Sequence, residues 1–281
     1  MVEIKPMPVI AVMILILVAF FIIFLLAARA GDVTQAFSRQ QCRATVELAS
    51  KSNLDFIGFE SPIPVECSTR YVTIKYGDPK KNTGLKTNNP VYYVQDSKDL
   101  KKFFAEEFMD CWWQMGEGTK KPFISADNSR CIICSDIKIE NDVVKDKNGR
   151  PRITVLDNFN QFMQTEKYPR TKQPYSDFYQ SGTVFPDITI AQNGEPVPYS
   201  ITFFYAKQKR WKAATVAFGG ALAGGCAAGM VLGPGVSVGC GIGAGVGTVM
   251  GIAKLVKGTE VVQSVFLAPF NGISNYCGQM F

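Results

Sequence analysis

The sequence has 281 residues, a net charge of +6, 47% hydrophobic residues and no histidine. Without histidine, Ser-His-Asp catalysis, Cys-His catalysis and histidine-ligated metal sites are excluded for this chain. Basic residues are scattered among acidic ones, so the mild positive charge indicates a solvated surface rather than a nucleic-acid patch. The eight cysteines favour disulfides in an oxidising compartment over reduced, buried thiols.

The first element is an uncharged segment of twenty residues, Pro8 to Ala27. At 1.5 Å per residue, a helix of this length spans about 30 Å, which is the hydrocarbon core of a bilayer. Ala28-Arg29-Ala30 is a faint cleavage site, but the long apolar stretch favours an uncleaved transmembrane anchor over 1–28. Residues 29–50 contain few helix breakers and predict a helical stalk.

Residues 51–206 together with 259–281 are expected to form a soluble α+β domain. A short helix is predicted at Leu156–Thr165, and an ordered loop with short strands at Tyr168–Pro198. Tyr199–Ala206 and Glu260–Leu267 flank a glycine-rich tract, and we expect these two strands to pair or lie side by side. Alternating or continuous apolar residues predict the strands: Val65–Cys67, Arg70–Tyr76, Pro90–Val94, Cys131–Ile139, Arg152–Leu156, Tyr199–Ala206 and Glu260–Leu267.

The clearest soluble helix runs from Ser97 to Met115. Asp96 or Ser97 can cap its start, and Gly116 can end it. Its apolar residues fall at helical spacing on one face: Leu100, Phe103, Phe104, Phe108, Cys111, Trp112 and Met115.

Three carboxylates on this helix, Glu106, Glu107 and Asp110, lie away from the apolar face in this pattern. They are therefore interpreted as a solvated surface rather than an acid/base pair. Trp112 belongs to the core face, whereas Trp113 is either half-buried or an exposed contact. Glu117 stands between two glycines, so it can be held in a strained loop, but a single glutamate does not make a site.

Cys111, Cys131 and Cys134 allow three chemical interpretations. A zinc site would need a fourth ligand, for instance Cys67 or Cys42. A thiol-redox pair would need Cys131 at a helix N-terminus, whereas its surroundings predict a strand. Structural disulfides are favoured, with Cys111 joined to Cys131 or to Cys134.

The tract from Ala213 to Ala253 carries no charge. Its repeated glycines predict two helices, Ala213–Leu232 and Val236–Val256, joined by a turn at Gly233, Pro234 and Gly235. This hairpin, within residues 207–258, is expected to be membrane-embedded. A partner-facing hairpin and a stored membrane-insertion element are the alternatives. The glycines assigned to close helix packing are Gly225, Gly229, Gly239, Gly243, Gly247 and Gly251.

Cys226 and Cys240 lie seven residues before and after Gly233. An antiparallel helical hairpin centred on Gly233 would place the two thiols at the same height. We therefore expect them to face each other, and to be bridged if this end of the hairpin meets an oxidising compartment.

The Cys111-Trp112-Trp113 helix end, the Gly116-Glu117-Gly118 segment and the later Cys131-x-x-Cys134 form a distinctive combination. In this it resembles a group of small archaeal membrane-anchored proteins that have no assigned activity. Those proteins also carry an N-terminal anchor and a Cys-x-x-Cys on a strand. The resemblance covers about residues 1 to 140 and the final strand, and it implies an anchored α+β domain. It does not include the glycine-rich hairpin.

No residue set predicts a catalytic, cofactor or metal site, and the glycine tract lacks the context of a nucleotide-binding loop. The expected role is a non-enzymatic structural or assembly protein of the cell envelope, with the lipid bilayer and further copies of this chain or other membrane subunits as partners. No nucleic acid or small-molecule substrate is evident. A membrane-active effector and a pilin-like subunit are the alternative functions.

The side of the membrane on which the domain lies is predicted by two conflicting signals. Lys207, Lys209 and Arg210 flank the glycine tract and favour a cytoplasmic domain. The cysteine content favours an extracytoplasmic one, and we adopt that assignment.

Overall fold

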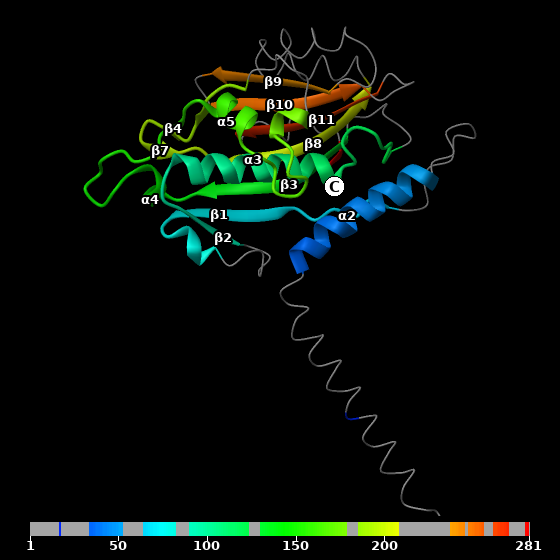
Figure 1. Cartoon of the computed structure of the whole chain (residues 1–281), viewed down its shortest axis with the longest axis horizontal. Helices are drawn as coiled ribbons and strands as arrows, with labels where there is room; N and C mark the ends of the chain where they lie inside the picture. Colours follow the sequence, from blue (N-terminus) through cyan, green and yellow to red (C-terminus); the bar gives the residue numbers. More distant parts are fainter. Residues whose placement is uncertain are drawn as a thin grey trace, which may run out of the picture.

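The computed structural model describes residue 17 and residues 34–52, 64–82, 90–123, 130–178, 185–207, 237–244, 247–255, 261–269 and 279–280 (Figure 1). Among these residues, none of the helices is both long and apolar enough to cross a membrane. Except for Leu17, the predicted anchor over 1–28 lies outside the described residues.

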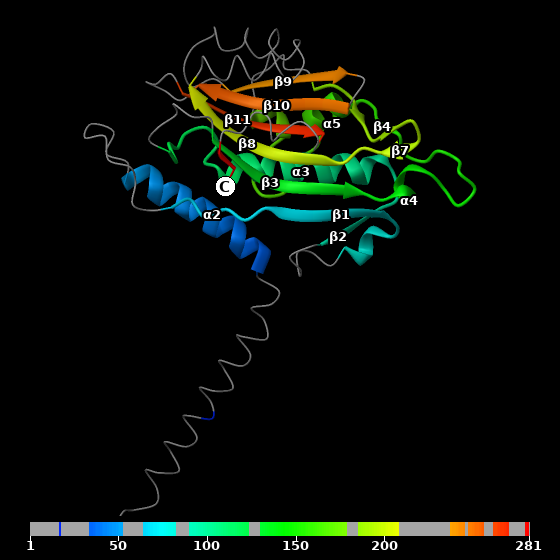
Figure 2. The ribbon, with the colours of Figure 1, turned by 180° about the vertical axis from the view of Figure 1, so that it is seen from behind.

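The described chain is a mixed α+β structure built on an eight-stranded sheet with the order β2-β1-β3-β8-β11-β10-β9, in which β12 also pairs with β3. Figure 2 shows the same sheet from behind. Its strands are β1 (Arg70–Tyr76), β2 (Val91–Val94), β3 (Arg130–Ile139), β8 (Tyr199–Lys207), β9 (Ser237–Ala244), β10 (Gly247–Leu255), β11 (Val261–Pro269) and β12 (Gln279–Met280).

The sheet has a parallel half and an antiparallel half. β1 pairs in parallel with β2 and β3, whereas β3, β8, β11, β10 and β9 pair antiparallel in succession. β8 and β11 pair along their whole length, from Lys207 opposite Val261 to Tyr199 opposite Pro269. This confirms the expected pairing of the two strands that flank the glycine tract.

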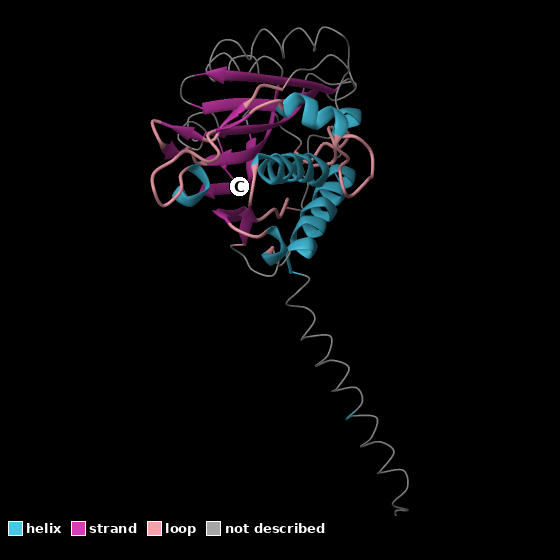
Figure 3. Ribbon diagram, turned by 60° about the vertical axis from the view of Figure 1, so that its left-hand side comes forward, coloured by secondary structure: helices cyan, strands magenta, loops and turns pink. Residues whose placement is uncertain are grey.

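The remaining elements are short, apart from the helices α2 (Thr34–Ser52) and α3 (Ser97–Gln114). Most helical residues lie on one side of the sheet (Figure 3). The other short elements are η1 (Pro79–Lys81), α4 (Asn141–Val144), β4 (Val155–Leu156), α5 (Phe159–Thr165), η2 (Tyr175–Phe178), β5 (Ile188–Thr189), β6 (Ala191–Gln192) and β7 (Glu195–Pro196).

Helix α3 forms where its capping residues predicted. The Asp96 side chain accepts a hydrogen bond from the backbone N–H of Asp99 at 2.9 Å, which caps the start. At the other end Gly116 has a φ of +82°, and the N–H groups of Gly116 and Glu117 bond to the carbonyls of Trp113 and Trp112. This is the glycine-terminated pattern that satisfies the last carbonyls of a helix.

The main core lies between α3 and the sheet. Phe104 and Phe108 of α3 are fully buried, and Phe104 meets Tyr199 of β8 with ring centroids 5.7 Å apart in an edge-to-face arrangement. Ile132, Phe203 and other residues on the same face of the sheet belong to this cluster. Edge-to-face packing adds about 0.5–1.5 kcal/mol to the burial of the two rings.

The predicted stalk is partly wrong, because α2 is a helix but does not stand free of the domain. Cys42, Val46 and Ala49 are 2% exposed or less. The helix contacts α3, and its Cys42 is disulfide-bonded to Cys67, with the two Cα atoms 4.6 Å apart. Residues 64–69 precede β1 without forming the predicted strand Val65–Cys67.

The helix predicted at Val236–Val256 is wrong over the described residues, which form β9 and β10 instead. Gly239 lies opposite Ile252, Gly243 opposite Thr248, and Gly251 opposite Cys240. A glycine step of four is an even number, so it fits the two-residue alternation of a strand as well as the face of a helix. Moreover β10 pairs with β11, so this part of the tract belongs to the main sheet.

The other half of the predicted hairpin lies outside the described residues. This applies to the helix Ala213–Leu232, to Gly225, Cys226 and Gly229, and to the turn at Gly233, Pro234 and Gly235. The facing of Cys226 and Cys240 was inferred from two helices. Cys240 lies in strand β9, so the packing of two helices does not place it opposite Cys226.

We expect the Cys42–Cys67 disulfide to stabilise the domain measurably. It closes a loop of 25 residues, and in the chain-entropy account such a link contributes about 3 kcal/mol. The double variant Cys42→Ser/Cys67→Ser should therefore unfold at lower urea concentration, with a free energy of unfolding lower by about 3 kcal/mol. Ser52→Ala is the control for mutation at the end of α2. An unchanged midpoint in the double variant would contradict a stabilising role.

Candidate functional site

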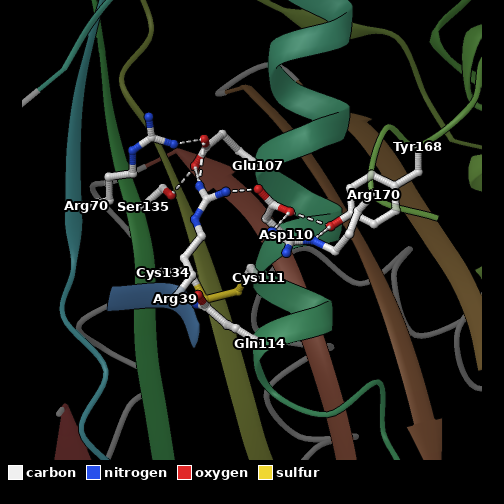
Figure 4. A network of polar contacts seen from close by, with 10 residues as sticks. All are labelled: Arg39, Arg70, Glu107, Asp110, Cys111, Gln114, Cys134, Ser135, Tyr168 and Arg170. Atoms are coloured by element: carbon white, nitrogen blue, oxygen red, sulfur yellow. Dashed lines mark hydrogen bonds and ion pairs between the residues drawn. A yellow bond between two sulfur atoms is a disulfide. The ribbon is translucent and has the colours of Figure 1, made fainter. Parts of the chain in front are cut away.

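The candidate site lies where α2, α3, β1 and β3 meet (Figure 4). Cys111 of α3 is disulfide-bonded to Cys134 of β3, with their Cα atoms 5.7 Å apart. This selects one of the two predicted partners of Cys111. Cys131 is also disulfide-bonded, so the Cys-x-x-Cys pair does not bond within itself.

The disulfides agree with the structural interpretation of these cysteines. Cys42 and Cys67, the candidate fourth ligands of a zinc site, are bonded to each other. Cys111, Cys131 and Cys134 are likewise oxidised, and a disulfide sulfur is not the thiolate that zinc binds. The structural interpretation therefore fits the geometry.

A β-bulge in β3 aims two consecutive residues at α3. The register with β8 shifts between Ile133 and Ser135, so Cys134 is the extra residue. Bulges of this kind redirect side chains and bend the strand. As a result, Cys134 reaches Cys111 and Ser135 reaches Glu107, which lies one helical turn before Cys111 on the same face of α3.

Glu107 is the centre of the polar network. Its side chain is 5% exposed, and Arg39 of α2 donates from Nη2 to both carboxylate oxygens at 2.8 Å. Arg70 of β1 donates a short hydrogen bond to Oε1, and the Ser135 hydroxyl donates to Oε2 at 2.7 Å. One carboxylate therefore joins three elements besides its own.

Asp110 extends the network toward the loop after α5. Arg39 pairs with Asp110 as well as with Glu107, and Figure 4 shows it between the two carboxylates. Tyr168 donates a short hydrogen bond to Asp110, and Arg170 donates to Asp110 at 3.1 Å. Arg170 also donates from Nε to the Tyr168 hydroxyl at 3.1 Å. Asp110 is 13% exposed and Arg170 is 34% exposed, so the Arg170 bond lies at the solvent-exposed edge of the network.

Burial and ion pairing act in opposite directions on these groups. Burial alone would raise the pKa of Glu107, but Arg39, Arg70 and the Ser135 hydrogen bond outweigh it and lower that pKa to about 2. Burial also lowers the pKa of Arg70, against the attraction of Glu107. At Glu106 the attraction of Lys102 and Arg39 is too weak to offset burial, so burial raises the pKa of this carboxyl group.

The interpretation of the three carboxylates as a solvated surface is therefore wrong for Glu107 and Asp110. Helical periodicity showed only the apolar face of α3, whereas α2 packs beside it and supplies Arg39. No local sequence pattern signals this contact, because Arg39 and Glu107 are separated by 68 positions. One hint of a buried ion pair was Arg70, a charged residue at the start of a strand whose other residues alternate between apolar and polar.

Trp113 is partly exposed and lies against two guanidinium groups. Arg170 lies 3.9 Å and Arg43 lies 4.4 Å from the centre of its ring system, and Arg43 also donates to the Trp113 carbonyl at 2.8 Å. Such cation–π contacts are worth about 0.5–1 kcal/mol at exposed positions. Glu117, with a φ of +56°, does occupy a strained backbone conformation.

Two neighbouring cavities meet at α3, and both are lined by Glu106 and Asp110. One has a volume of about 260 Å³ and is also lined by Arg39, Arg70, Tyr92 and Phe103, among others. The other has a volume of about 320 Å³ and is lined in addition by Tyr168, Pro169 and Arg170. Within the described ranges, no cluster of three or more acidic or cysteine side chains is arranged to hold a metal ion.

Comparison of the chain with known protein families, with characterised proteins and with solved structures found no match. The resemblance to archaeal membrane-anchored proteins therefore stays a prediction.

We expect Glu107→Gln to destabilise the fold strongly. The substitution keeps the shape of the side chain but leaves Arg39 and Arg70 without their shared counter-charge, and breaking a buried ion pair typically costs about 3–5 kcal/mol. The matched control is Glu166→Gln, which removes the exposed pair with Lys98 at 3.2 Å and should cost less than about 1 kcal/mol. Equal losses in urea unfolding would contradict the assignment of Glu107 as a buried charge held by the two arginines.

The same carboxylate predicts a loss of stability in acid. The folded-state pKa of Glu107 is about 2, below its usual value of 4.5. Its contribution is therefore complete above about pH 5 and disappears as the pH falls toward 2. The difference in unfolding free energy between the unmodified protein and Glu107→Gln should shrink between pH 6 and pH 3. A constant difference over this range would contradict the assignment.

Proposed function

We propose that this protein is a non-enzymatic structural or assembly protein of the cell envelope, with its α+β domain on the extracytoplasmic side of a membrane. The observation that carries the proposal is the way in which α2 is fastened to the domain. This helix directly follows the segment in which the sequence predicts a membrane anchor.

The fastening is of two chemical kinds. The Cys42–Cys67 disulfide ties the middle of α2 to the segment before β1. The pairs of Arg39 with Glu107 and Asp110 tie the helix to α3, and Arg43 adds its contacts with Trp113. A flexible tether would need none of these contacts, so the arrangement supports a domain mounted rigidly on its anchor.

The oxidised cysteines support the extracytoplasmic assignment. Cys42, Cys67, Cys111, Cys131 and Cys134 are all disulfide-bonded. Structural disulfides persist in secreted and extracytoplasmic proteins and are rare in the reducing cytosol. The charged residues that flank the glycine tract favour the other side, but they act statistically during insertion and impose no chemistry on the folded domain.

A structural role also agrees with the chemistry of the buried network. Glu107 and Asp110 are held by arginines and hydroxyl groups of the same chain. Their oxygens are already engaged by these partners, whereas a general acid or base must be able to exchange a proton with a substrate. The membrane-active alternative relied on a helical glycine-rich hairpin, and β9 and β10 take up the second half of that tract.

The proposal predicts oxidised cysteines and membrane association in the native protein. Membranes isolated under alkylating, non-reducing conditions should retain the full-length chain after a carbonate wash. Mass spectrometry should then show no alkylation at Cys42, Cys67, Cys111 or Cys134. Chemical cross-linking of the same membranes should yield complexes of more than one subunit. Alkylated cysteines would contradict the extracytoplasmic assignment. Release of the chain by carbonate would contradict the membrane anchor, and the absence of cross-linked complexes would contradict the assembly role.

A further inference from the structure

The two cavities beside α3 contain groups that the ion network does not use. Glu106 lines both cavities, yet its ion pair in the described structure is with Lys102 at 3.9 Å, at the outer limit of such contacts. Tyr92 lines the smaller cavity, and its hydroxyl makes no hydrogen bond to the residues that the structure describes. These two side chains have hydrogen-bonding capacity left for a ligand.

The walls around these groups are fixed in place. Arg39 bonds to both Glu107 and Asp110, and all three side chains line the smaller cavity. Arg170 is held by Asp110 and Tyr168 and lines the larger cavity. Because side chains locked by their neighbours do not have to be ordered when a ligand binds, the cavities are preorganised.

The charge balance of the walls indicates the class of ligand. Three arginines, Arg39, Arg70 and Arg170, face three carboxylates, Glu106, Glu107 and Asp110. A charged ligand would upset this balance, and an uncompensated charge beside the buried Glu107 is costly. An uncharged ligand leaves this balance intact.

The shape and the apolar lining narrow the class further. The ring of Tyr92 packs against Phe103 with centroids 4.8 Å apart, and both line the smaller cavity. Pro169 lines the larger one. Each cavity is small, close to the lower end of the range for ligand pockets. A carboxyl group, a phenol and an arginine together offer both acceptors and donors, which match hydroxyl groups that both donate and accept.

We propose that the paired cavities that meet at Glu106 bind an uncharged polyhydroxylated ligand, namely sugar residues of a glycan, with the sugar hydroxyls bonded to Glu106 and Tyr92 and one apolar ring face against Tyr92 and Phe103. A glycan in two adjacent cavities would occupy them with consecutive sugar units. Only the source of the glycan, the cell envelope, rests on the proposed function.

The test is isothermal titration calorimetry of the detergent-solubilised full-length chain. The probes are maltotriose, a mannose trisaccharide and tri-N-acetylglucosamine, with glutamate, lysine and inorganic phosphate as charged probes. We expect at least one trisaccharide to bind and the charged probes not to bind. Tyr92→Phe removes one hydroxyl and should weaken binding roughly three- to tenfold, and Glu106→Gln should weaken it at least about tenfold.

Glu195→Gln is the matched control, since Glu195 pairs with Lys145 and lines neither cavity. The affinity of this variant for the trisaccharide should equal that of the unmodified protein. Unchanged thermal midpoints in all three variants would exclude a folding defect. Three outcomes would overturn the inference: no binding of any trisaccharide, equal binding by all variants, or binding of a charged probe in place of the sugars. None of them would affect the fractionation and cross-linking result, so the two proposals fail independently.

Discussion

Burial of one carboxylate, Glu107, between two arginines is the constraint on which the rest of the described structure depends. The cost of removing three charged groups from water is recovered only when the geometry is close and the remaining lone pairs are satisfied. Arg39 reaches Glu107 only if α2 packs beside α3, and Arg70 reaches it only if β1 pairs with β3. The network therefore specifies an arrangement of elements more than it adds net stability.

Local structure was predictable where a short pattern decides it. Asp96 and Gly116 mark the ends of α3 because capping depends on neighbouring backbone groups, and β8 and β11 are mostly apolar segments of strand length on either side of the glycine tract. The site was not predictable in the same way. The partners Arg39, Arg70 and Arg170 come from three separate parts of the chain, and nothing in the charge of an isolated arginine tells which carboxylate it will meet.

The glycine tract shows a second limit of sequence patterns. Glycine has no side chain to reveal which face is buried, and a step of four residues satisfies the geometry of both a helix and a strand. The neighbouring strand β11 determines that this part of the tract is a strand, since Ile252 and Ala253 of β10 pair with Val265 and Ser264 of β11. Long-range pairing thus overrides an apparent helical repeat, as context often overrides propensity.

The order of the strands has a consequence for how the chain folds as it is made. The loops closed by Cys42–Cys67 and Cys111–Cys134 span 25 and 23 residues, and both are complete once β3 has been synthesised. By contrast β8 lies between β3 and β11, and β11 comes later in the chain than the whole glycine tract. Non-local pairings form slowly because loop closure must precede the contacts that reward it. The N-terminal half can therefore be locked covalently while one edge of β8 still waits for its partner, and during that interval β8 is the strand most open to pairing with the wrong chain.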